Sequence, residues 1–132
     1  MLKRILVLSL FLSSLVASIH ADDKFITHVT LTTYNATNAQ CDNSPNKTAN
    51  GTIIDHKKLK QGKLKYCAIS RDLLWCIPMG SIIYIDGHGR YEVVDTTDAR
   101  FNHYIDILQY HTKKNFKKKK IKIVLVKKYK KK

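Results

Sequence analysis

Short runs of β-branched and aromatic residues recur along the chain, and each is bounded by polar or glycine-containing turns. Such runs are typical of short β-strands. They fall at residues 28–34, 51–55, 66–70, 81–85, 91–94, 105–108 and 121–126. Asp86-Gly87 after the fourth run predicts a hairpin turn, and residues 71–74 predict one helical turn. Six or seven short strands with so little helix predict an all-β fold, either a small barrel or a sandwich.

Two longer connections interrupt this pattern. Residues 35–51 are polar and rich in Asn and Thr, and long ordered connections of this kind are often functional. Residues 57–65 are basic, and we expect them to form a flexible link.

Residues 1–21 have the three-part pattern of a secretory signal peptide. Lys3 and Arg4 precede a mostly apolar run at residues 5–16, and Ala21 stands before two aspartates. The run is shorter than the roughly 20 residues that a membrane-spanning helix needs, which argues against an anchor. We therefore expect a secreted or periplasmic protein, associated with the cell envelope and cleaved after about Ala21.

Charge is unevenly distributed along the chain, which carries 24 Lys and Arg against 10 Asp and Glu, a net charge of +14. Residues 22–112 balance ten basic against ten acidic side chains, whereas residues 113–132 hold twelve lysines and no acid. The body of the chain is thus neutral and its C-terminal end is cationic. We expect one domain at residues 26–126 and a lysine-rich tail at 127–132. The tail would attract anionic envelope polymers or lipids, or be a solvated end. Its lysine-only basic composition argues against specific nucleic-acid recognition.

Three cysteines, Cys41, Cys67 and Cys76, allow at most one internal disulfide in an oxidising compartment. The sequence does not choose the pair. A catalytic cysteine is an alternative, but no cysteine and histidine stand at a spacing known for that chemistry. The histidines and cysteines also lack the spacing of a zinc site, so we expect neither a metal nor a cofactor.

Three aspartates stand out by their setting as candidates for acid–base chemistry. Asp72 follows a buried strand, Asp95 follows two valines, and Asp106 lies between Ile105 and Ile107. Since neighbours on a strand point to opposite faces, Asp106 points outward if the isoleucines face the core. A carboxyl group held against apolar and like-charged neighbours has a raised pKa, as a general acid near neutral pH requires. The alternative is that these aspartates cap turns or pair with arginine.

Several motifs also follow one another in a recognisable order. They are Thr32-Thr33-Tyr34, Cys67-Ala-Ile-Ser-Arg-Asp72-Leu-Leu74, Ile77-Pro-Met-Gly-Ser81, Val94-Asp95-Thr96 and Tyr104-Ile-Asp106. Asp106 follows Asp95 by 11 residues. In order and spacing, the motifs resemble those of the 3D domain, a family named for its three aspartates. The resemblance covers about residues 28–126.

This resemblance implies a small six-stranded double-psi β-barrel with minor helical turns, related to lytic transglycosylase A, rare-lipoprotein-A-like proteins and expansins. Active members cleave the β-1,4 bond between N-acetylmuramic acid (MurNAc) and N-acetylglucosamine (GlcNAc) in peptidoglycan. They leave a 1,6-anhydro end and consume no water. By motif position, Asp106 matches the residue that acts as acid and then base, Asp95 its close neighbour, and Asp72 a third, more structural aspartate. Thr32 and Tyr34 are expected to bind the sugar or the carboxylate.

The segment after Asp95 departs from the family pattern. The family has Asp-Thr-Gly-Gly-Ala-Ile, whereas residues 95–101 read Asp-Thr-Thr-Asp-Ala-Arg-Phe. A module that binds or loosens cell-wall glycan without cleaving it, as expansins do, is therefore the alternative to a lytic transglycosylase. A third hypothesis is a cationic protein that acts on anionic surfaces and uses the barrel as a scaffold. The expected partner is the glycan strand of peptidoglycan, bound by a monomer.

Overall fold

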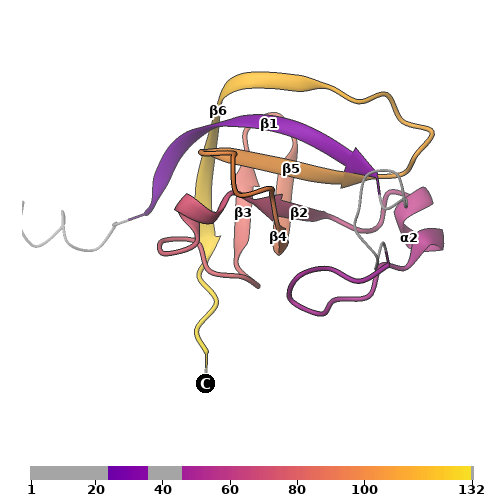
Figure 1. Cartoon of the computed structure of the whole chain (residues 1–132), viewed down its shortest axis with the longest axis horizontal. Coiled ribbons are helices and arrows are strands. Elements are labelled where there is room, and N and C mark those ends of the chain that lie inside the picture. The colour runs from indigo at the N-terminus through magenta and orange to yellow at the C-terminus, as the bar shows by residue number, and fades with distance from the viewer. Residues whose placement is uncertain (1–23, 36–45, 132) are drawn as a thin grey trace, which may run out of the picture.

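The computed structural model describes residues 24–35 and 46–131, and the expected signal peptide and Cys41 lie outside these described residues. The elements, in chain order, are β1 (Ile26–Asn35), α2 (His56–Lys60), β2 (Tyr66–Ile69), the 3-10 turn η1 (Arg71–Leu73), β3 (Ile82–Ile85), β4 (Gly89–Thr96), β5 (Tyr104–Gln109) and β6 (Lys117–Lys127) (Figure 1). Within the described residues, no helix is long and apolar enough to cross a bilayer.

The six strands form one closed barrel in the order β1-β5-β2-β4-β3-β6. β1 pairs with β5 and β2 pairs with β4 in parallel, while the other pairings around the barrel are antiparallel. The order around the barrel differs from the order along the chain. The connection from β1 to β2 crosses over β5, and the connection from β4 to β5 crosses over β2. This closed six-stranded barrel with two parallel pairs confirms the expected fold.

All six strands contribute inward-facing residues to one apolar core. Fully buried members of this core on the strands include Leu31, Ile69, Ile83, Ile85, Val93, Ile105 and Ile123. On β5, Ile105 and Ile107 both belong to this core, so Asp106 between them points away from it. On the outer face of β5, Leu108 packs with Ile54 and Leu59, which joins α2 to the barrel.

Two connections differ from the sequence-based expectation. The run at 51–55, predicted as a strand, forms only an isolated bridge between Ile53 and Lys47. The segment at 57–65, predicted as a flexible link, instead starts within helix α2. The Asp55 side chain accepts a hydrogen bond from the Lys58 N–H at 3.1 Å, which caps the helix, and Leu59 is buried beneath it. One capping residue and one buried apolar side chain are therefore enough to form a helix in a segment whose basic composition predicts a flexible link.

The last strand also begins earlier than predicted, at Lys117 rather than at Ile121. Closing the barrel requires β6 to pair with both β1 and β3. The early lysines of β6 pair with β1, with Lys117 opposite Thr32 and Lys118 opposite Leu31, while their side chains stay exposed. Beyond the strand, the Tyr129 N–H donates to the Oγ of the buried Ser81 at 3.0 Å. Much of the lysine-rich C-terminal region is thus part of the barrel or held against it.

Cys67 and Cys76 are buried free thiols, so they are not joined to each other. Burial raises the pKa of both thiols, and the charges of Asp106 and Glu92 raise that of Cys67 further. A reactive cysteine needs a lowered pKa and access to solvent. Neither thiol therefore suits the nucleophilic role that the sequence left open.

Candidate functional site

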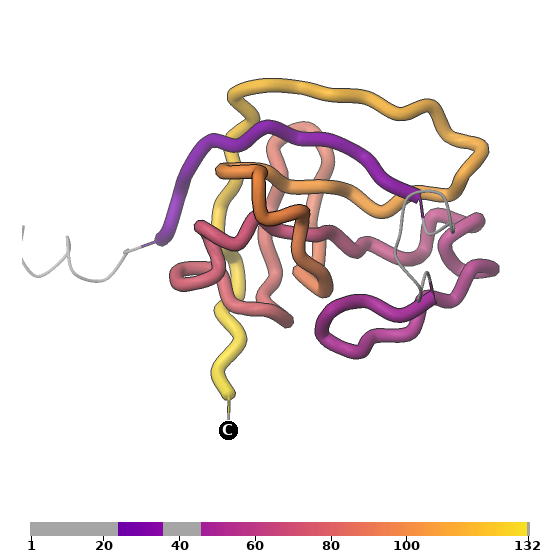
Figure 2. Tube along the Cα trace, viewed as in Figure 1, coloured from indigo at the N-terminus to yellow at the C-terminus, as the bar shows by residue number. Residues whose placement is uncertain are grey.

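A groove of about 880 Å³ runs over the outer face of β1, β5, β2 and β4. The strands supply Thr32, Tyr34, Ala68, Asp95 and Asp106. One wall is formed by the segment before α2, with Lys47, Thr48, Ala49 and Ile54. The other wall is formed by the segment between β4 and β5 and the first residue of β5, with Thr97, Asp98, Arg100, Phe101 and Tyr104. Figure 2 shows the wall segment at 46–54 beside α2, on the side of the barrel away from the C-terminal segment. Four of the five residues predicted for the site thus meet in one groove.

The pairing register places the central residues in a row across four strands. Thr32 on β1 is opposite Asp106 on β5, Asp106 is opposite Ala68 on β2, and Ala68 is opposite Asp95 on β4. Registered partners on neighbouring strands project from the same face of a sheet. The two carboxylates therefore flank the small side chain of Ala68, with their Cα atoms about 10 Å apart.

A β-bulge brings Asp95 to this face. Cys67 is opposite Val93, but the next residue of β2, Ala68, is opposite Asp95, so Val94 has no partner of its own. Without the bulge, Val94 would face the groove and Asp95 would point the other way. The bulge also explains why Val93 and Val94 are both buried although they are neighbours on a strand.

Asp106 lies largely buried at the floor of the groove, where the Thr32 hydroxyl donates a hydrogen bond to its Oδ1 at 3.0 Å. Burial raises the pKa of Asp106 to about 6; the hydrogen bond from Thr32 lowers it in part, and the charge of Asp95 raises it. At a pH near 6, this carboxyl group is present in both protonated and ionised forms. It is therefore able to donate a proton and to take one back.

Asp95 is held in place by the backbone. Its Oδ1 accepts hydrogen bonds from the Thr96 N–H at 2.9 Å and from the Ala49 N–H at 3.1 Å. The Asn50 N–H also donates to the carbonyl oxygen of Val94 at 3.2 Å, so this wall is joined to β4 at two points. Two N–H donors suit a carboxylate, which only accepts hydrogen bonds.

The wall at 46–54 is braced by its own side chains. Asn50 Oδ1 accepts hydrogen bonds from the hydroxyl groups of Thr48 and Thr52, each at 2.7 Å. Gly51 has a positive φ of 87°, which allows the tight turn beside them. Part of the polar connection that the sequence marked as functional thus forms a defined wall of the groove.

Basic side chains surround the two carboxylates, and the sequence did not single them out. Lys47, Arg71, Arg100 and Lys117 all line the groove. Arg100 lies 3.8 Å from Asp98, and the Lys117 ammonium lies 5.8 Å from the centre of the Tyr104 ring. Lys117 could not be found from the sequence because it lies within a run of lysines whose strand was predicted to start later. A groove with two central carboxylates and a basic rim suits a substrate that carries negative charge.

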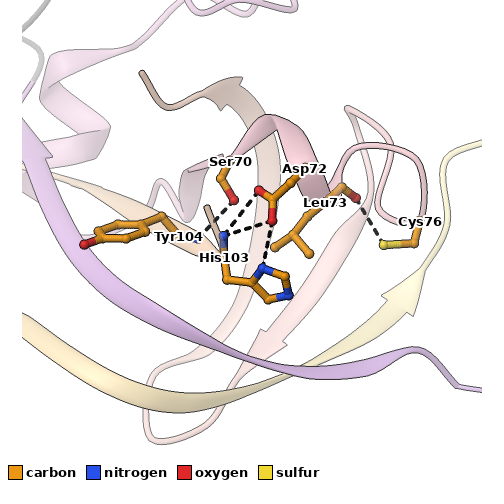
Figure 3. Close-up of polar contacts among 6 residues, drawn as sticks. All are labelled: Ser70, Asp72, Leu73, Cys76, His103 and Tyr104. Atoms are coloured by element: carbon orange, nitrogen blue, oxygen red, sulfur yellow. Dashed lines mark hydrogen bonds and ion pairs between the residues drawn. The ribbon is translucent and has the colours of Figure 1, made fainter. Parts of the chain in front are cut away.

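Asp72 is not among the residues that line the groove; it lies in η1 and faces His103, the residue directly before β5 (Figure 3). Its carboxylate accepts hydrogen bonds from the His103 N–H at 3.0 and 3.2 Å and lies 2.8 Å from His103 Nδ1. Burial raises the pKa of Asp72, but hydrogen bonds from Ser70 and His103, with the charge of His103, outweigh it and leave the pKa lowered. His103 has a positive φ of 53°, so Asp72 stabilises a strained residue directly before β5.

Among the residues that the structure describes, no three His, Cys, Asp or Glu side chains are grouped so that they could hold a metal ion.

Compared with known proteins, the sequence matches no family model and no curated protein. The likeness to the 3D domain therefore stays a prediction that depends on the order and spacing of the motifs.

Proposed function

We propose that this protein is an exported peptidoglycan-active enzyme, a lytic transglycosylase that cleaves the MurNAc–GlcNAc β-1,4 bond. The observation that carries the proposal is the state of Asp106, a carboxyl group with a pKa of about 6 on the floor of an open groove, beside a second, anchored carboxylate. A general acid for a glycosidic oxygen needs this combination of access and raised pKa.

In the proposed reaction, protonated Asp106 donates its proton to the glycosidic oxygen as the bond to C1 of MurNAc breaks. The C6 hydroxyl of the same sugar then attacks C1, and the Asp106 carboxylate takes the proton that this hydroxyl loses. The bond from C1 to O6 replaces the bond to the leaving sugar, so no water is consumed and Asp106 ends protonated. Asp95 stabilises the positive charge that develops near C1.

The arrangement of the two carboxylates favours one acid–base residue over a pair with separate duties. Ordinary glycosidases use a second carboxylate as nucleophile or as base toward water. Here the second carboxylate, Asp95, already accepts hydrogen bonds from two backbone N–H groups, and strand β2 separates it from Asp106. A nucleophile supplied by the substrate removes the need for that second role.

The basic rim of the groove agrees with this substrate class. Peptidoglycan carries carboxylates on its stem peptides, and Lys47, Arg71 and Lys117 line the groove where they would attract them.

Digestion of purified peptidoglycan sacculi, followed by mass spectrometry, tests the proposal. We expect muropeptides that are lighter by one water than hydrolysis products and that take up no oxygen from labelled water. Asp106→Asn should abolish them, whereas the matched control Asp86→Asn, on the exposed β3–β4 turn, should not. Products that contain labelled oxygen would contradict the lytic reaction.

A glycan-binding module without turnover is the second candidate. It is favoured by the segment after Asp95, where Thr97 and Asp98 stand in place of the family's two glycines and line the groove. This candidate predicts that the protein co-sediments with sacculi, releases no soluble product, and keeps its binding in the Asp106→Asn variant.

A further inference from the structure

Exposed apolar side chains gather at the side of the barrel where β6 ends. Among the described residues, six large hydrophobic side chains are exposed: Ile26, Ile53, Trp75, Tyr84, Val126 and Tyr129. All except Ile53 belong to the start of β1, the turn after η1, β3, and the end of β6 with the segment that follows it. Figure 1 shows these segments on the side of the barrel opposite α2. The most exposed is Trp75, at 80%, and it is the only tryptophan of the chain.

Strand pairing places three of these segments in one row. Tyr84 on β3 is opposite Val124 on β6, and Val124 is opposite Ile26 on β1. Ile26, Val124 and Tyr84 therefore form an apolar strip across three strands on the outside of the barrel. Val126, at an irregularity in the pairing of β6 with β3 close to this strip, is also exposed.

The turn that carries Trp75 lies beside the residues that follow β6. The charge of Lys128 acts on the thiol of Cys76, the residue next to Trp75. Tyr129 packs on Gly80, where an added Cβ would lie 3.1 Å from the tyrosine ring. The contact between Tyr129 and Gly80 keeps the residues after β6 close to the turn at 74–80.

Exposed lysines lie on β6 and directly after it, next to the apolar residues, and no acidic residue follows them in the chain. Lys122, Lys127, Lys128, Lys130 and Lys131 are all exposed, and no Asp or Glu occurs after Asp106. With Ile26, Trp75, Tyr84 and Val126, these five lysines make up what we call the basic apolar face.

We propose that the basic apolar face binds the surface of an anionic phospholipid bilayer. The lysines would attract the negative headgroups, and Trp75 and Tyr84 have the amphipathic side chains that favour the boundary between headgroups and hydrocarbon. A soluble polyanion would neutralise the lysines but would leave an exposed tryptophan and three further apolar side chains in water. The apolar strip therefore favours a lipid surface over a charged polymer.

This inference is independent of the reaction proposed for the groove, although it agrees with a location at the cell envelope. Thr32 lies six residues after Ile26 on β1, which separates the groove from this face by about 20 Å along the strand. A protein bound to lipid through the basic apolar face would keep its groove accessible to a polymer above the membrane.

Vesicle binding by the chain from Asp22 onward tests the proposal, since this form keeps every strand and core residue of the barrel. The vesicles contain phosphatidylglycerol and phosphatidylcholine in one set and phosphatidylcholine alone in the other. We expect co-sedimentation with the anionic vesicles that weakens as salt rises. We also expect a blue shift of the Trp75 emission and its quenching by brominated lipid.

Two variants and their matched controls locate the surface. Replacing Lys127, Lys128, Lys130 and Lys131 by Gln should weaken binding at least about 100-fold, and Trp75→Ala should weaken it about tenfold. The controls replace Lys57, Lys58, Lys60 and Lys63 by Gln, and Ile53 by Ala, all around α2 on the opposite side, and should bind like the parent chain. Equal losses in the controls would overturn the proposal. Binding to soluble polyglycerol phosphate without vesicle binding or a Trp75 shift would overturn it as well.

Discussion

Asp72 lies in η1 and contacts His103 directly before β5, whereas Asp106 lies within β5, and the pKa values of the two carboxyl groups are shifted in opposite directions. Around Asp72, hydrogen bonds from Ser70 and His103 outweigh burial, and the pKa is lowered. Around Asp106, burial outweighs the hydrogen bond from Thr32, and the pKa rises to about 6. The number of donors around a carboxylate, and not the residue type, therefore separates a group that stabilises the fold from one that can transfer a proton.

Asp106→Asn should have the largest effect on activity and should show the contrast between Asp106 and Asp72 most clearly. We expect activity on sacculi to fall at least about 100-fold, because Asn cannot donate and recover a proton. The free energy of unfolding, in contrast, should be higher in the variant at a pH above about 6. Since the folded pKa is raised, the contribution of Asp106 to stability is complete below its ordinary pKa of 3.8 and is lost as pH rises through about 6.

The rise from 3.8 to about 6 corresponds to about 3 kcal/mol. The Asn variant should therefore be more stable than the parent chain at pH 8, by up to this amount, and no more stable at pH 3. Urea unfolding at the two pH values measures the difference. A variant that is destabilised at pH 8 would contradict the description of Asp106 as a carboxyl group disfavoured in its charged form.

Asp95→Asn removes a charge but keeps an oxygen that can accept from Ala49 and Thr96. The pKa of Asp106 should fall toward its ordinary value, since the charge of Asp95 contributes to raising it. We expect the pH at which activity declines to move lower, and activity at pH 7 to fall roughly tenfold. An unchanged pH profile would show that the two carboxylates do not interact.

Ala68→Val places two methyl groups between the carboxylates. Ala68 is buried and lies opposite both Asp95 and Asp106. We expect a loss of stability of about 1–3 kcal/mol from crowding, and weaker binding to sacculi. The matched control Ala99→Val, at an exposed position, should change neither.

Asp72→Asn should have the smallest effect on the groove and an effect on stability opposite to that of Asp106→Asn. Because the folded pKa of Asp72 is lowered, its stabilisation is present above its ordinary pKa and is lost as pH falls. Hydrogen bonds to a charged group contribute about 1.5–3 kcal/mol, and solvent weakens those of a partly exposed carboxylate. The variant should therefore lose about 1–2 kcal/mol at pH 7 and little at pH 3. A gain in stability at pH 7 would contradict the conclusion that the Asp72 carboxylate stabilises the fold.

Much of the barrel could be predicted from the sequence because its strands are short, apolar and bounded by turns. The outward direction of Asp106 also follows from simple alternation, with Ile105 and Ile107 facing the core. Alternation fails on β4, because the bulge at Val94 reverses the direction of the next residue. A bulge depends on the pairing of two distant strands, and no local pattern reveals it.

The helix at 56–60 and the early start of β6 were missed for a related reason. Basic residues suggest solvent, but a capping aspartate and a buried leucine are enough for one helical turn. Likewise, lysines enter a strand when barrel closure provides partners for their backbones. The basic rim of the groove, Lys117 included, depends on these same distant pairings.

NMR titration of the Asp106 carboxyl carbon, in the chain from Asp22 onward, tests the central claim most directly. We predict a midpoint near pH 6 that falls when Asp95 is replaced by Asn. A midpoint near 3.8 would mean that Asp106 is an ordinary ionised surface group at neutral pH, and the proposed acid would not exist.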